Sequence, residues 1–244
     1  MTDMATRRKD AQGSALMTLI RAIASHDQQE ALSLLDASPG LAREVVETGA
    51  TRQVSTDYYF KEIEHYVYGG DTALHIAAAA YALEISKELL ARGANVRARN
   101  RRGAGPLHYA VDGAPDSHTW NPTAQQAIVE CLIEVGADPN CEDKSGVTPL
   151  HRAVRTRCTA AVQTLLANGA NPRLRNGSGS TSLHLAVQNT GRGGSGSSAS
   201  REQQREIILL LLKHGARPTD KDDAGKSVRE SARIQWVLDL LGSF

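Results

Sequence analysis

Apolar residues recur along most of this chain at intervals of three and four positions, the spacing that places side chains on one face of a helix. The clearest stretch, residues 146–179, contains two such faces. The first comprises Leu150, Ala153 and Val154, and the second comprises Val162, Leu165 and Leu166. This pattern predicts two short helices in succession, each of which buries one face.

The ends of these two helices carry start and stop signals. Thr148 stands at the N-cap position, and Pro149 follows at the first helical position, where its missing N–H costs nothing. Gly169 ends the second helix, because glycine adopts the left-handed conformation after a helix at little cost. Asn176-Gly177 then supplies a turn. The stretch therefore predicts one complete helix–turn–helix unit.

The same signals return along the chain with a regular period. Leu-His pairs end at His75, His108, His151 and His184, with separations of 33, 43 and 33 residues. Gly-Ala pairs begin at Gly93, Gly136, Gly169 and Gly215. A period of 33 residues with the pattern T-P-L-H-x-A is the signature of one repeat architecture. The chain resembles the ankyrin-repeat family in four segments, which read GDTALHIAAAA, GAGPLHYAVD, GVTPLHRAV and GSTSLHLAV.

This resemblance implies an all-α ankyrin-repeat solenoid, in which stacked helix–turn–helix units are joined by fingers that resemble β-hairpins. We expect about six units, including degenerate caps. The expected parts are a disordered tail at 1–13, an N-terminal cap with an aromatic insert at 14–69, four repeats at 70–103, 104–146, 147–179 and 180–225, and a C-terminal cap at 226–244. Inserts at 113–123 and 190–202 each separate the two helices of one repeat, and the second is a Gly/Ser-rich loop.

The resemblance also assigns a structural role to the residues of the repeat motif. It implies that each motif histidine bonds backbone groups of its own turn and of the neighbouring unit. A histidine that returns in every repeat cannot form a single active site. The residues given this structural role are Thr72, His75, His108, Thr148, Pro149, His151, His184, Gly93, Gly136, Gly169 and Gly215.

Five of the ten aromatic residues gather in the segment 48–69, before the second unit. They are Tyr58, Tyr59, Phe60, Tyr66 and Tyr68. Tyrosine offers a large amphipathic contact area, which favours it at interfaces. Two interpretations stay open: the rings cover the thin first unit, or they form an exposed surface that recognises a partner. Trp120, in the first insert, likewise either packs back on the repeats or meets a partner.

Arginines form the other candidate surface. They are Arg99, Arg101 and Arg102 on one finger, Arg173 and Arg175 on the corresponding finger two units later, and Arg152 and Arg155 in the inner helix between. Together they would form a basic strip, interrupted by the acidic finger at 141–146. The strip is either ordinary solvated surface, a site for an acidic protein segment, because arginine pairs bidentately with carboxylates, or a site for nucleic acid.

Composition and net charge disfavour several classes of function. The net charge is +1, which disfavours nucleic acid as the partner. Three cysteines without paired spacing favour an intracellular, cytoplasmic setting, and no apolar run is long enough for a membrane span. The cluster Asp112, Asp116 and His118 lacks the spacing of a metal site, and Cys158 has no identifiable base beside it. We expect no metal, no cofactor and no catalysis.

The resemblance implies a non-catalytic module that binds a partner protein through its finger loops and inner-helix faces. The expected contact surface is the aromatic segment together with the arginine fingers and Trp120. Two alternatives remain: a regulatory or immunity-type subunit that masks a partner enzyme, and a binder of an anionic ligand or nucleic acid. We expect a monomer or weak self-association.

Overall fold

The computed structural model describes residues 14–113, 120–188 and 198–243. The tail expected at 1–13 and most of both inserts lie outside these residues. The described residues are mainly helical, and the predicted all-α repeat fold is confirmed. They form two compact units, one of residues up to 110 with 130–137, and the other of residues 111–129 with the chain from 138 onward.

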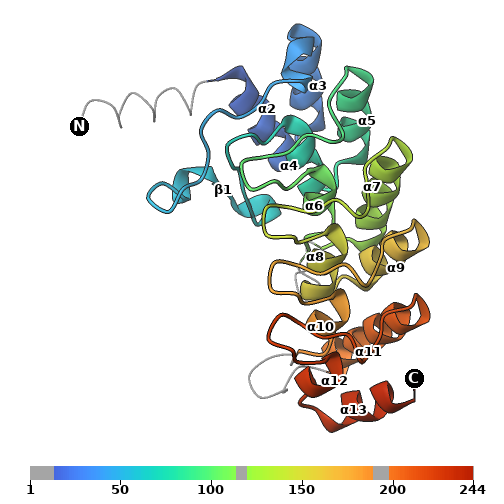
Figure 1. Cartoon of the computed structure of the whole chain (residues 1–244). Helices are drawn as coiled ribbons and strands as arrows, with labels where there is room; N and C mark the ends of the chain where they lie inside the picture. Colours follow the sequence, from blue (N-terminus) through green and yellow to red (C-terminus); the bar gives the residue numbers. More distant parts are fainter. Residues whose placement is uncertain (1–13, 114–119, 189–197, 244) are drawn as a thin grey trace. The chain divides into compact units, whose positions relative to one another are not determined.

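In the residues that the structure describes, the first unit contains five helices and the end of a sixth. The five are α2 (Ala15–Ala24), α3 (Gln28–Ala37), α4 (Ala73–Ala79), α5 (Leu83–Ala91) and α6 (Pro106–Ala110), with a 3-10 turn η1 (Pro39–Ala42) after α3. Helix α4 packs against α2, α5 and α6, and Figure 1 shows α2, α4 and α6 side by side. Every residue of α4 is buried, so this short helix lies at the centre of the unit's core.

The second unit continues the pattern of short paired helices. Helix α7 (Pro122–Glu134) contributes to both units, and it is followed by α8 (Pro149–Arg155), α9 (Thr159–Ala167), α10 (Ser182–Ala186), α11 (Ser198–Lys213), α12 (Val228–Ser231) and α13 (Gln235–Gly242). Helix α8 packs against α9 and α10, and α11 packs against α9 and α10. Leu150, Val162 and Leu183 are among the side chains buried between them.

The helix ends carry the predicted signals. Thr148 caps α8 by accepting a hydrogen bond from the backbone N–H of His151 at 3.3 Å. Gly136 and Gly169 have φ values of +99° and +85°, a conformation that only glycine adopts freely. Two boundaries differ from the prediction, and in the first of them α7 begins at Pro122, just inside the insert expected at 113–123. The insert expected at 190–202 ends by residue 198, where α11 begins, because Glu202 to Gln204 favour a helix that the apolar face from Ile207 anchors.

Candidate interaction surface

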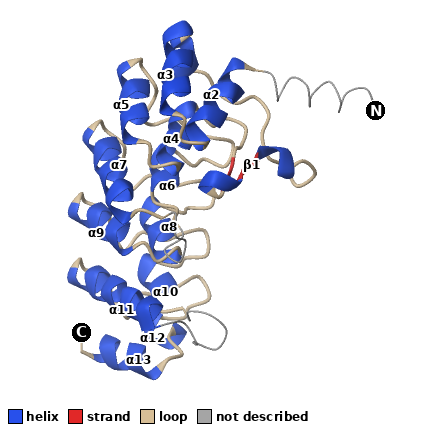
Figure 2. Ribbon diagram, turned by 180° about the vertical axis from the view of Figure 1, so that it is seen from behind, coloured by secondary structure: helices blue, strands red, loops and turns tan. Residues whose placement is uncertain are grey.

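The aromatic segment forms a small hairpin in the first unit. Strands β1 (Tyr59–Phe60) and β2 (His65–Tyr66) pair antiparallel, with Tyr59 opposite Tyr66 and Phe60 opposite His65. They are the only strands in the part of the chain that the structure describes. The 3-10 turns η2 (Thr56–Tyr58) and η3 (Lys61–Ile63) flank β1. Figure 2 shows this element beside α4 and α6, and residues 57–68 are called the aromatic hairpin below.

Side chains of the aromatic hairpin alternate between two faces, as they must in a strand pair. On the inner face, Tyr58 is only 6% exposed, and its hydroxyl lies 3.2 Å from Thr48 Oγ1. On the outer face, Tyr59 is 41% and Tyr66 38% exposed, with ring centroids 4.8 Å apart. Tyr68 continues this row, 6.3 Å from Tyr66. One face of the segment therefore covers the first unit, and the other face is exposed to solvent.

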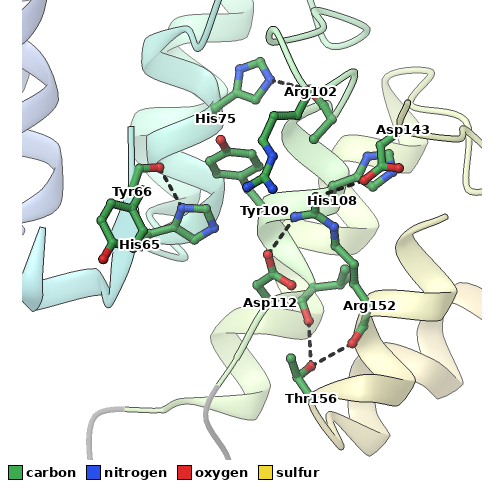
Figure 3. A network of polar contacts seen from close by, with 12 residues as sticks. His65, Tyr66, His75, Arg102, His108, Tyr109, Asp112, Asp143, Arg152 and Thr156 are labelled. Atoms are coloured by element: carbon green, nitrogen blue, oxygen red, sulfur yellow. Dashed lines mark hydrogen bonds and ion pairs between the residues drawn. The ribbon is translucent and has the colours of Figure 1, made fainter. Parts of the chain in front are cut away.

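A buried carboxylate anchors the aromatic hairpin to the repeats. Asp71 is fully buried and accepts hydrogen bonds from the Tyr109 hydroxyl at 2.8 Å, from Asn100 Nδ2 at 2.9 Å and from the Tyr68 backbone N–H at 2.6 Å. The His65 ring stacks on Tyr109 with centroids 4.2 Å apart, and His75 meets the same ring edge-on (Figure 3). Tyr109 of α6 thus contacts both the carboxylate of Asp71 and the His65 ring of the aromatic hairpin.

The arginines of the neighbouring finger turn toward the aromatic hairpin. The guanidiniums of Arg101 and Arg102 lie over the Tyr68 ring, 5.5 and 4.9 Å from its centroid. Arg102 also donates to the Tyr68 hydroxyl at 2.9 Å, and Arg101 donates to the Ala50 carbonyl. Arg99 donates to the Gly103 carbonyl at 2.9 Å. All three arginine side chains therefore bond to groups of the protein itself. Arg101 and Arg102 lie along the Tyr68 edge of the aromatic hairpin.

Arginines of the second unit are largely paired with carboxylates. Arg152 Nη1 lies 2.8 Å from Asp112 and Nη2 lies 3.4 Å from Asp143, and these three side chains are 11–22% exposed (Figure 3). Arg173 holds Asp220 through two hydrogen bonds of 3.0 and 3.1 Å. Arg175 also pairs with a carboxylate, that of Asp223, at 2.7 Å. Arg155 is exposed.

Three motif histidines, His75, His151 and His184, lie between a turn of their own repeat and a carbonyl of the next. In His151, Nδ1 lies 3.2 Å from the Thr148 backbone nitrogen, and Nε2 lies 3.1 Å from the Ser180 carbonyl. The corresponding Nε2 contacts of His75 and His184 are 3.2 Å each, to Ala104 and Lys226. His108 Nδ1 accepts from the Gly105 N–H at 3.2 Å, and burial lowers the pKa of His151.

The other candidates, Trp120, Cys158 and the cluster around Asp112, lie in different settings. Trp120 is half-buried and donates to Gln125 Oε1 at 3.2 Å. Cys158 is buried, and burial raises its thiol pKa, which opposes formation of a thiolate. Asp116 and His118 lie outside the described residues. Within the described ranges no group of three or more His, Cys, Asp and Glu side chains could hold a metal ion. No described helix is both long and apolar enough to cross a bilayer.

Sequence reasoning did not single out Asp71, Tyr109 or His65. The residue that follows each motif histidine carried a signal. It is apolar in two repeats, Ile76 and Leu185, and polar in the other two, Tyr109 and Arg152. Both polar residues bind a carboxylate, Asp71 for Tyr109 and Asp112 for Arg152. A polar residue at a position that is otherwise apolar thus marks each network.

Comparisons with known proteins agree with this architecture. The family model described as ankyrin repeats (3 copies) matches residues 123–222, and the model of a single ankyrin repeat matches residues 69–101. Together the two matches cover more than half of the chain.

Curated relatives match over parts of their length. An ankyrin repeat protein of Acanthamoeba polyphaga mimivirus is 32% identical over 121 residues, which are 46% of this chain and 15% of that protein. The NF-kappa-B inhibitor alpha of Sus scrofa is 33% identical over 96 residues, 38% of this chain and 27% of that protein. The cyclin-dependent kinase 4 inhibitor B of Rattus norvegicus is 34% identical over 88 residues, 36% of this chain and 59% of that protein. The chain thus spans less than two thirds of each.

Proposed function

This chain belongs to the ankyrin-repeat family, and on that premise we propose that it is a non-catalytic module that binds a partner protein through the outer face of the aromatic hairpin. Ankyrin repeats are protein–protein interaction modules. The observation that carries the proposal is the pair of exposed rings, Tyr59 and Tyr66, on an element whose other face is buried. Aromatic residues of this kind are enriched where interfaces carry most of their binding energy.

The aromatic hairpin is suited to recognition because it is held in place before a partner arrives. Its inner face is fixed by Tyr58 and His65, and its base by the hydrogen bond from the Tyr68 N–H to Asp71. A preorganised surface loses less conformational entropy on binding than a mobile loop does. The proposal includes an intracellular, cytoplasmic location, which the free cysteines Cys131, Cys141 and Cys158 support.

The arginine fingers and Trp120 have less support as the main contact. Arg102 is bonded to Tyr68, and Arg173 to Asp220, so their charges are already partly matched inside the protein. An acidic segment or nucleic acid would have to compete with these internal partners. Trp120 likewise bonds to Gln125 and is half-buried. We therefore rank these surfaces below the aromatic hairpin.

A second candidate is a regulatory subunit that masks the surface of a partner enzyme. Two relatives are named as inhibitors, one of NF-kappa-B and one of cyclin-dependent kinase 4. Both candidates use the same surface, and they differ in whether the partner loses activity in a stoichiometric complex. An assay of the captured partner's activity separates them.

The test is capture of a partner from lysate of the source cells by the wild type and by a Tyr59→Ser/Tyr66→Ser variant. Both rings are exposed, so the variant should keep the melting temperature of the wild type. Val135→Ser, which removes an exposed apolar side chain elsewhere, is the matched control. A protein that is held by the wild type and the control but not by the double variant supports the proposal. Equal capture by all three would overturn it.

A further inference from the structure

We propose that the aromatic hairpin recognises a basic segment of its partner, with an arginine or lysine of that segment placed over Tyr59 or Tyr66 beside the carboxylates of Glu62 and Glu64. The inference rests on the proposed function, since it takes the outer face of the aromatic hairpin as the binding surface. It adds the chemical class of the partner.

The protein itself contains an example of this contact. Two guanidiniums, from Arg101 and Arg102, lie over the ring of Tyr68, and Arg102 also bonds to its hydroxyl at 2.9 Å. Cations are attracted to the face of an aromatic ring because the ring's quadrupole is negative there. The innermost ring of the row is therefore already covered by internal cations.

The next two rings of the same row are exposed to solvent. Tyr66 lies 6.3 Å from Tyr68, and Tyr59 lies 4.8 Å beyond it, centroid to centroid. Among the described residues, no guanidinium or ammonium group lies over either ring. An incoming basic side chain would therefore repeat, one ring further along, the arrangement that Arg102 makes on Tyr68.

Charge at the tip of the aromatic hairpin selects the same kind of partner. Residues 57–66 include three acidic side chains, Asp57, Glu62 and Glu64, and one basic side chain, Lys61. Glu62 and Glu64 are exposed, and neither forms an ion pair with another described residue. An acidic segment or a phosphate backbone would meet repulsion here, whereas a basic segment would gain both carboxylates.

The conformation of Glu64 agrees with a role for its side chain. Glu64 ends the turn η3 with φ of +50°, in the left-handed region where residues with a Cβ are uncommon. Glycine would adopt this conformation without a steric cost. The turn therefore keeps a carboxylate at a position where the backbone alone favours a residue without a side chain.

The experiment measures binding of two labelled hexapeptides, Gly-Arg-Gly-Arg-Gly-Arg and Gly-Glu-Gly-Glu-Gly-Glu, to the purified full chain by fluorescence anisotropy at low salt. We expect the arginine peptide to bind and the glutamate peptide not to bind. Glu62→Gln/Glu64→Gln should raise the Kd of the arginine peptide about three- to tenfold, the range expected for two exposed charge contacts. Tyr59→Leu/Tyr66→Leu, which keeps apolar area but removes the rings, should weaken binding to a similar degree.

The matched control is Glu202→Gln/Glu206→Gln, which removes two exposed carboxylates from α11 and should leave the Kd unchanged. Melting curves of all variants show whether the fold is kept. Equal binding of both peptides, or an unchanged Kd in Glu62→Gln/Glu64→Gln, would overturn the inference. In that case, loss of the lysate partner in Tyr59→Ser/Tyr66→Ser would still support the surface, and only the basic class of partner would be wrong.

Discussion

The motif histidines show how a single side chain joins two repeats. The His151 ring is buried, with Nδ1 3.2 Å from the Thr148 backbone nitrogen and Nε2 3.1 Å from the Ser180 carbonyl. A neutral ring with its proton on Nε2 satisfies both backbone groups, as acceptor for one and donor to the other. A second proton would face the Thr148 N–H donor and would bury a charge. The ring is therefore built to stay neutral.

This arrangement predicts that acid weakens the fold. Burial lowers the pKa of His151 from its ordinary value of 6.5, so between the two values the unfolded chain binds a proton that the folded chain does not. The contribution of His151 is complete above pH 6.5 and is lost as the pH falls below it, by at most about 1.4 kcal/mol per pH unit. Urea unfolding at pH 7.5, 6.5 and 5.5 measures the change.

A titration of the ring signals by NMR isolates this residue. The His151 resonance should titrate below pH 6.5 in the folded protein. A His151 resonance that titrates above pH 6.5 would show that the ring is stabilised in its charged form, contrary to the argument.

The aromatic hairpin departs from the repeat pattern of paired helices. Two strands of two residues cannot be stable alone. The hairpin is ordered because Asp71, at the start of the next repeat, bonds both the Tyr68 N–H and the Tyr109 hydroxyl. Its position thus depends on a side chain of α6 that lies 38 residues beyond Asp71 in the chain.

Replacing Tyr109 by Phe tests this dependence. The change leaves the ring that stacks on His65 but removes the hydroxyl that donates to buried Asp71. We expect a loss of about 1–3 kcal/mol in unfolding free energy, because a buried carboxylate loses a donor. Amides of residues 57–68 should also exchange faster with solvent. Tyr59→Phe, which removes an exposed hydroxyl, should change stability by less than about 0.5 kcal/mol. Equal effects of both substitutions on the free energy of unfolding would mean that the hydrogen bond from Tyr109 to Asp71 does not stabilise the fold.

The helix pairs and the hairpin differ in how far the sequence alone predicts them. The helices follow from local information: Thr148 and Pro149 start α8, and Gly169 follows the end of α9. The division of the rings into buried Tyr58 and exposed Tyr59 depends instead on strand register, which the distant Asp71 network sets. The segment's own sequence contains no sign of that contact, which is marked only by the polar Tyr109 in the next repeat, so the burial of each ring could not be assigned from the segment alone.

The arginines show the same limit. The sequence places Arg152, Arg173 and Arg175 in related repeats, and a basic strip was a reasonable expectation from their spacing. The carboxylates that receive them are Asp112, Asp220 and Asp223, which come from other parts of the chain. These carboxylates offset part of the arginines' positive charge locally.

At the scale of the whole molecule, repeats that contact only their neighbours should respond locally to damage. Arg152→Met tests this, because it leaves Asp112 and Asp143, 22% and 11% exposed, without the cation between them. Loss of one partner from a largely buried ion pair costs about 3–5 kcal/mol, and partial exposure should reduce this to about 2–3 kcal/mol. The double variant Asp112→Asn/Arg152→Met should recover part of the loss, because one of the two carboxylates that lose the cation is then neutral.

Hydrogen exchange followed by mass spectrometry locates the effect. Helix α8 carries Arg152 and packs against α9 and α10, so amides in residues 149–186 of Arg152→Met should exchange faster. Amides of α2 and α3 should keep their wild-type rates under the same conditions. The Tyr109→Phe variant gives the opposite control, with faster exchange around the aromatic hairpin and unchanged rates in α9. If either variant raised exchange uniformly over all helices, the chain would unfold as one cooperative unit, and its stability would not be a sum of neighbouring contacts.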